Sequence, residues 1–203
     1  MQKTLLAAAV VAAALIGAPA AFATRPGDAA PNFEARDVDG NLVKLSDFKG
    51  KTVVLDWANY QCPFDRMHYE SGHIPGLQKT YVADGVIWLT IMSSAPGQQG
   101  FFPPTELKSQ DARVKNAASH VLPDPTGAIG HLFEAKTTPH IFVIDPKGVV
   151  AYEGAIDGTP STSPSTLAAA TPLAENAIKA VMAGQKPSPA ATAPYGCSVK
   201  YAQ

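Results

Sequence analysis

The segment TVVLDWANYQCP, residues 52–63, decides the fold. Residues 52–57 form an almost unbroken run of apolar and β-branched side chains, which is typical of a central strand buried on both faces. Pro63 suits the first position of a helix, because the N–H that proline lacks would have no partner in the first turn. Cys62 is therefore expected between a buried strand and a helix N-terminus, where ligands and reactions gather in open α/β sheets.

The flanking sequence predicts alternating strands and helices around this junction. Residues 32–45 indicate a β-hairpin, since Asp39-Gly40-Asn41 supplies the positive φ angles of a tight turn. Further strands are expected at 85–91, 120–122, 141–144 and 148–152, the last two forming an antiparallel hairpin. A helix is expected at 63–71, and a second turn or helix through residues 77–82 after a break at Gly72 and Pro75. Further helices are expected at 105–119 from an N-cap at Thr105, at 127–135 and from Thr171 to Gly184. This order predicts an α/β sandwich with a mixed central sheet.

The termini predict an exported chain with a tail. Residues 1–23 read as a secretory signal, with a basic start, an apolar run and an Ala-Phe-Ala cleavage site. The run is too short to span a bilayer, so we expect a periplasmic or extracellular protein without stable membrane insertion after cleavage. Residues 24–184 would form the folded domain, and residues 185–203 a Pro-rich tail that carries Cys197.

Charge and cysteine content narrow the function. The chain has 203 residues with 16 basic and 17 acidic side chains, and no basic run that would favour nucleic-acid binding. Its two cysteines are too few for a disulfide scaffold. At a helix start, free N–H groups and the helix dipole stabilise a thiolate, so Cys62 is a candidate nucleophile. The alternative is a buried, inert thiol.

Several segments together resemble a known family. They are the Asp-Gly hairpin, residues 57–63, Lys136-Thr137-Thr138-Pro139 before the strand at 141–144, and Gly148 to Tyr152. Over residues 26–184 the chain resembles the redoxin group, thioredoxin-like proteins of the alkyl hydroperoxide reductase/thiol-specific antioxidant (peroxiredoxin) type. The resemblance implies a thioredoxin-like α/β/α sandwich with an N-terminal β-hairpin, and a cis-proline at Pro139 facing Cys62. Thr138 and Pro139 would then position the substrate.

The departures from this family concern the groups around Cys62. Asp65 stands where a Cys-x-x-Cys motif has its second cysteine, so a local dithiol is unavailable. The proline and threonine of the peroxiredoxin Pro-x-x-x-Thr-x-x-Cys pattern are Leu55 and Asn59 here. The Asn59 amide can still hold a peroxide oxygen through hydrogen bonds. The family's arginine has no clear match, and Arg66, on the helix face of Cys62, is the substitute expected to stabilise the thiolate. The alternative for Arg66 is a solvated surface charge.

Cys197 is the one internal thiol that could capture a sulfenic acid formed on Cys62. Three roles stay open for it: a redox-cycling partner, a permanent disulfide with Cys62, or an unpaired thiol. A bridge would close a loop of about 135 residues and stabilise the fold by roughly 5 kcal/mol at most. Tyr195 and Tyr201 beside it favour a docked tail.

A metal centre and a cofactor are not expected. Cys62, His68 and His73 are the nearest potential ligands in sequence, but a single nearby cysteine is a poor match to thiolate metal sites. The sequence thus predicts an exported thiol-dependent oxidoreductase that reduces peroxides or exchanges protein disulfides and is regenerated by an unidentified thiol reductant. The alternative is a binding or scaffold protein of the same fold in which a Cys62–Cys197 disulfide is structural.

Overall fold

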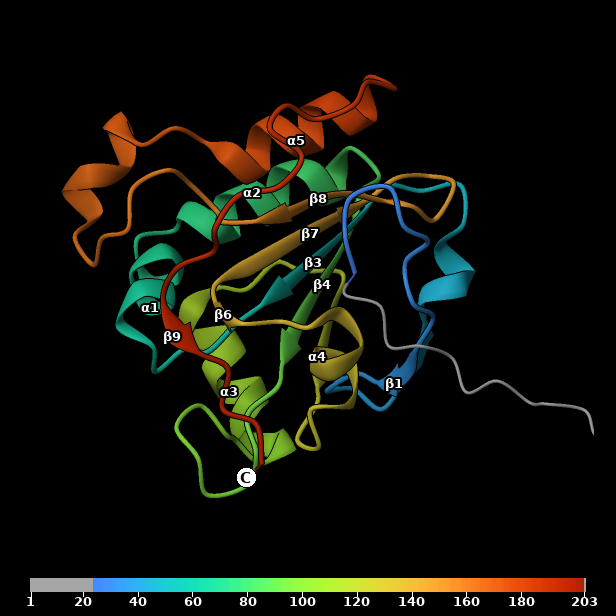
Figure 1. Cartoon of the computed structure of the whole chain (residues 1–203). Coiled ribbons are helices and arrows are strands. Elements are labelled where there is room, and N and C mark those ends of the chain that lie inside the picture. The colour runs from blue at the N-terminus through green and yellow to red at the C-terminus, as the bar shows by residue number, and fades with distance from the viewer. Residues whose placement is uncertain (1–23, 203) are drawn as a thin grey trace, which may run out of the picture.

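A five-stranded mixed sheet forms the centre of the molecule (Figure 1). The structure is a computed structural model that describes residues 24–202, so the expected secretory signal lies outside the described residues. The strand order is β5 (His120–Pro123), β4 (Ile87–Met92), β3 (Val53–Trp57), β7 (His140–Ile144) and β8 (Val150–Gly154). Parallel pairing joins β3 to β4 and β4 to β5, whereas β7 runs antiparallel to both β3 and β8. The mixed sheet and the hairpin of its last two strands confirm the sequence prediction.

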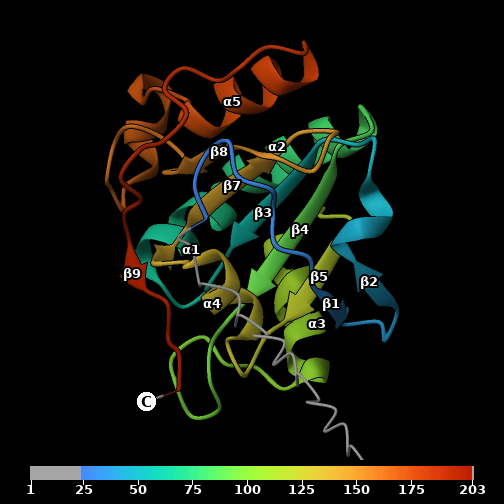
Figure 2. The same cartoon turned by 45° about the vertical axis from the view of Figure 1, so that its right-hand side comes forward.

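Helices and a hairpin cover the two faces of the sheet (Figures 1 and 2). One face packs against α1 (Pro63–Glu70), α2 (His73–Ala83), α3 (Pro104–Val114) and α5 (Leu173–Met182). The other face packs against α4 (Ala128–Phe133), the hairpin of β1 (Glu34–Arg36) and β2 (Leu42–Lys44), and the 3₁₀ helix η1 (Leu45–Phe48). A second 3₁₀ helix, η2 (Pro164–Ala169), lies in the Ser/Thr/Pro-rich loop. This is the expected α/β/α sandwich with its N-terminal hairpin.

The central strand is buried on both faces, as its composition predicts. Side chains alternate along β3, so that Val53, Leu55 and Trp57 enter one core and Val54 enters the other. Burying each such large apolar side chain contributes about 1.5–3 kcal/mol. Asp56 is the exception in this strand, a carboxyl group with no exposed surface on the α1 side of the sheet.

Two of the predicted helices, α3 and α5, have boundaries that differ from the sequence prediction. α3 begins at Pro104, not after Thr105, and it ends at Val114, not Ser119. Its end follows from Lys115, whose left-handed conformation (φ 56°) stops the helical hydrogen-bond pattern. The expected N-cap at Thr171 was also wrong, since α5 begins at Leu173.

Pro75 does not interrupt a helix. It is the third residue of α2, and the first turn of a helix has N–H groups without helical partners, so a proline fits there without loss of a hydrogen bond. Gly72, in the left-handed region at φ 79°, is the residue that separates α1 from α2.

The C-terminal tail packs along the domain (Figure 1, red). It passes α1, and its short strand β9 (Cys197–Ser198) pairs antiparallel with β6 (Thr137–Thr138). Farther on, the Tyr201 hydroxyl donates a hydrogen bond to the carbonyl of Ala135 at 2.8 Å. The tail is docked, as its tyrosines indicated. Among residues 24–202, no helix is both long and apolar enough to span a bilayer.

Candidate active site

Cys62 occupies the N-cap position of α1, at the end of the turn that follows β3. Its N–H donates to the carbonyl of Asn59 at 2.8 Å, and its own carbonyl accepts the first helical hydrogen bond from Arg66 N at 2.7 Å. Pro63 takes the first helical position, as the sequence predicts. Cys62 has no exposed surface, but the groups around its sulfur are polar.

The sulfur of Cys62 meets backbone groups from two distant segments. Cys197 N donates to Sγ at 3.3 Å, and Sγ lies 3.2 Å from the carbonyl oxygen of Thr138. Burial by itself would raise the pKa of Cys62, but hydrogen bonds from the Cys197 thiol, the Asp65 amide and the Cys197 amide outweigh it and lower that pKa below its ordinary value. The helix N-terminus and the tail together thus stabilise a thiolate at Cys62.

The second thiol has the opposite tendency. Burial and the hydrogen bond to Cys62 raise the pKa of Cys197 to about 12. Both cysteines are free thiols in this structure, and Cys62 is the one poised to lose its proton. The pair therefore has one nucleophile and one proton-bearing partner in contact.

A cis peptide bond joins Thr138 to Pro139, which confirms the expected cis-proline. Thr138 also pairs with Cys197 across β6 and β9, and this register brings the second thiol to the first. The approach depends on Gly196, which has φ 118°. A Cβ atom there would lie 2.1 Å from the carbonyl oxygen of Thr138, so only glycine permits this contact.

Asn59 and Arg66, the two groups expected to polarise the thiolate, have other partners. The Asn59 side chain accepts from Gln61 N at 2.9 Å and donates to the carbonyl of Gln99 at 3.3 Å, which ties the loop after β4 to the active-site turn. Arg66 is half exposed, and its Nε lies 3.9 Å from a carboxylate oxygen of Glu70. Within residues 24–202, neither side chain makes a hydrogen bond to the sulfur of Cys62.

Two buried carboxyl groups beneath Cys62 were not assigned a role from the sequence. Asp65 accepts a hydrogen bond from Asn59 N through Oδ2, while its Oδ1 has no partner among the described residues. Burial and the neighbouring charge of Asp56 raise the pKa of Asp65 well above its usual range. Burial raises the pKa of Asp56 to about 6, although the Tyr69 hydroxyl donates to it at 2.8 Å. The signal for Asp56 was a lone acidic residue in a buried apolar strand.

Tyr195 anchors the tail two residues before Cys197. Its hydroxyl donates to Asp157 Oδ1 at 2.7 Å and lies 3.0 Å from Nε2 of His68. Its ring meets the ring of Phe64 edge-on, with centroids 6.0 Å apart. These contacts hold Cys197 above Cys62.

Comparison with known proteins gives a family and a fold. The model of the AhpC/TSA family matches residues 26–153. A search of curated proteins found no match.

Three solved structures are similar to this chain. A conserved protein of uncharacterized function from Geobacillus kaustophilus has a TM-score of 0.75 and 23% identity over 87% of this chain and 92% of its own. A hypothetical protein from Sinorhizobium meliloti 1021 has a TM-score of 0.73 and 20% identity, covering 87% and 94%. A Chlorobium tepidum protein, provisionally named a thiol:disulfide interchange protein DsbE, has a TM-score of 0.52 and 27% identity, covering 64% and 84%.

Proposed function

The chain belongs to the AhpC/TSA family, and on that premise we propose that it is an exported thiol oxidoreductase whose redox pair is Cys62 and Cys197. The observation that carries the proposal is the contact between the two cysteines, in which the Cys197 amide donates to the Cys62 sulfur at 3.3 Å and the Cys197 thiol lowers the pKa of Cys62. The signal-like composition of residues 1–23 supports export.

The favoured reaction is exchange with a disulfide substrate. The Cys62 thiolate attacks one sulfur of the substrate, forms a mixed disulfide and releases the other sulfur as a thiolate. Cys197 then loses its proton and attacks the Cys62 sulfur, which releases the second substrate thiolate. The protein ends as the Cys62–Cys197 disulfide, the substrate gains two electrons, and an external thiol reductant reverses the process.

The same pair can reduce a peroxide. The Cys62 thiolate attacks one peroxide oxygen, becomes a sulfenic acid and releases an alcohol or water once the leaving oxygen is protonated. Cys197 condenses with the sulfenic acid, forming the disulfide and a water molecule.

Disulfide exchange is favoured over peroxide reduction because Asn59 and Arg66 bond to other groups and do not offer a peroxide a polar contact beside the sulfur. The 27% identity to the DsbE-named protein supports the same choice.

Access to Cys62 requires movement of the tail. The sulfur is buried under Cys197, and β9 occupies the edge of β6 beside Thr138. A substrate that used the backbone of Thr138 and Pro139 for positioning would replace β9 at this edge. The reaction cycle therefore alternates between a docked and a released tail.

A binding or scaffold protein is the second candidate function. The docked tail favours it, because Cys197 already lies against Cys62 and a permanent disulfide there would only fasten the tail. In that case the cysteines would undergo no turnover.

One experiment separates the two functions. Reduced full-length protein is mixed with stoichiometric glutathione disulfide or hydrogen peroxide, and the cysteines are followed by mass spectrometry. The oxidoreductase forms the Cys62–Cys197 disulfide faster than free glutathione reacts, Cys197→Ser accumulates a mixed disulfide or sulfenic acid on Cys62, and Cys62→Ser does not react. If Cys62 reacts with both reagents no faster than a free thiol does, the result supports the scaffold. The ratio of the rate with glutathione disulfide to the rate with hydrogen peroxide identifies the preferred substrate.

A further inference from the structure

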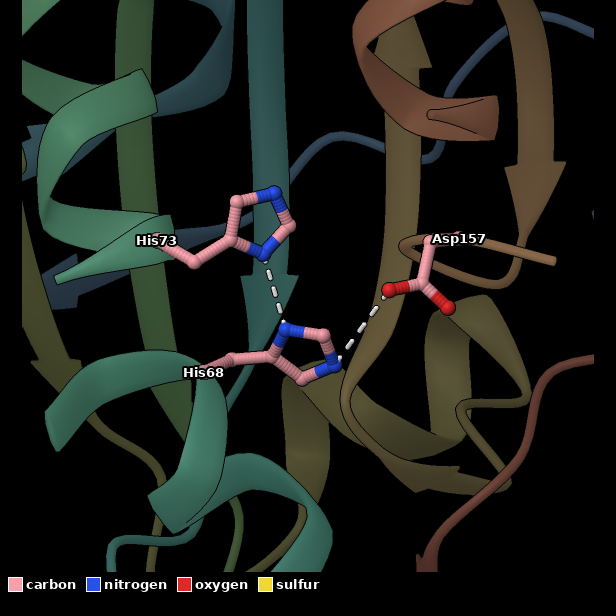
Figure 3. Close-up of side chains that lie close together, drawn as sticks. All are labelled: His68, His73 and Asp157. Carbon is pink, nitrogen blue, oxygen red and sulfur yellow. Dashed lines mark hydrogen bonds and ion pairs between the residues drawn. The ribbon is translucent and has the colours of Figure 1, made fainter. Parts of the chain in front are cut away.

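Three potential metal ligands from separate elements meet behind the tail. His68 lies in α1, His73 is the first residue of α2, and Asp157 follows β8. One ligand atom from each lies within 4.8 Å of the other two, and Figure 3 shows the His68 ring between the other two side chains. We propose that this cluster binds a divalent transition-metal ion of the zinc type.

The hydrogen bonds assign a lone pair to the metal-facing nitrogen of His68. The Tyr195 hydroxyl donates its proton to Asp157, so its oxygen accepts from Nε2–H of His68 at 3.0 Å. A neutral His68 then carries its lone pair on Nδ1, which lies 2.8 Å from Nδ1 of His73. In the metal-free protein His73 donates to that lone pair, and a metal ion can take the place of this proton.

The contact between the two rings requires a neutral imidazole, the form that metal binding needs. Their Nδ1 atoms lie 2.8 Å apart, and one of them must accept the hydrogen bond through a lone pair. His73 is half-buried, and when its Nδ1 binds the ion the ring proton moves from Nδ1 to Nε2, so the ring stays neutral.

Separation of the two rings and a turn of Asp157 would turn the cluster into a zinc site. Zinc binds imidazole nitrogen and carboxylate oxygen at about 2.0–2.2 Å, which places two tetrahedral ligand atoms about 3.3 Å apart. The two rings therefore separate by about half an ångström, and Asp157, whose Oδ2 lies 3.9 Å from Nε2 of His68, turns toward the Nδ1 edge of that ring. Its Oδ1 and Nε2–H of His68 keep their bonds to Tyr195, the type of outer contact that orients metal-binding histidines. A water molecule takes the fourth position.

This cluster revises the expectation of no metal. The sequence grouped the two histidines with Cys62, whereas the fold joins them to Asp157, a residue far along the chain. Because Tyr195 bonds to both His68 and Asp157, an ion here would also stiffen the docked tail. The site does not depend on the proposed redox function.

The test uses the full chain with Cys62→Ser and Cys197→Ser, which removes thiolates as competing ligands. Zinc titration by calorimetry should show one saturable site, and Co²⁺ should give the visible bands of a tetrahedral complex. His73→Asn should weaken zinc binding by about tenfold or more, whereas His131→Asn, at an exposed histidine of α4, should not change it.

Asp157→Asn should also weaken binding, and circular dichroism confirms that each variant is folded. The proposal is overturned if the thiol-free protein shows no saturable zinc binding. It is equally overturned if His73→Asn and Asp157→Asn, both folded, bind zinc as tightly as their parent. Either result leaves the redox proposal unaffected, since these proteins lack both cysteines.

Discussion

Oxidation of the Cys62–Cys197 pair should raise the free energy of unfolding by about 2–3.5 kcal/mol. The bridge joins positions 135 apart in the chain, and the entropy of closing such a loop sets a limit of about 5 kcal/mol. The reduced fold, however, already stabilises the Cys62 thiolate through the S–H of Cys197. A hydrogen bond to a charged group contributes about 1.5–3 kcal/mol, and it disappears on oxidation because the disulfide has no proton to donate.

The same difference can be measured as a reduction potential. Because about 1.4 kcal/mol corresponds to 30 mV for two electrons, folding should lower the potential of the pair by about 45–75 mV relative to the unfolded chain. Urea unfolding of the oxidised and reduced proteins gives the free energies, and glutathione redox buffers give the potentials with and without urea. Cys197→Ser, treated identically, should show no difference.

Two results would refute this reasoning. A stabilisation of the full 5 kcal/mol, or a potential lowered by about 110 mV, would mean that the reduced pair has no special stabilisation and that the bridge is a structural staple. Failure of the two thiols to form a disulfide would refute their pairing altogether.

Three further predictions concern single side chains. Gly196→Ala should release the tail and increase the alkylation rate of Cys62, measured by mass spectrometry, by about fivefold or more. The control Gly184→Ala, at a glycine that also has positive φ but faces open space, should leave the rate unchanged, and equal rates in the two variants would contradict a tail held by close backbone contact. Folding raises the pKa of Asp56 to about 6, so the free energy of unfolding of the wild type should fall by up to about 3 kcal/mol relative to Asp56→Asn as pH rises from about 4 through 6. Urea midpoints measured against pH check this, and parallel pH profiles for the two proteins would argue against it. Arg66→Ala should leave the alkylation rate of Cys62 within about twofold, because its Nε is paired elsewhere; a tenfold fall would restore the arginine as the thiolate's partner.

Local sequence patterns were sufficient for the strand–cysteine–helix junction. The apolar run of β3 and Pro63 each act through their immediate neighbours, so both could be interpreted without the rest of the chain. Helix ends were less predictable: α3 ends where Lys115 adopts a left-handed conformation, which no residue type in that segment demands.

The side-chain partners of the site were beyond the reach of such patterns. Arg66 lies on the correct helix, but whether it turns to Cys62 or to Glu70 depends on packing outside α1. Asn59 likewise bonds to Gln99, which reaches it from a loop after another strand. Helical spacing gives proximity along one element and does not decide between competing partners.

The sequence by itself determined that a cysteine lies where a buried strand meets a helix, because periodicity, turn residues and proline act over a few neighbouring positions. Only the tertiary structure decided what surrounds that cysteine. Thr138 and Cys197 reach it across 76 and 135 positions, and Tyr195 reaches His68 across 127. These contacts form because the chain returns along the edge of the fold, and such long-range pairing leaves no local periodic signal in the sequence.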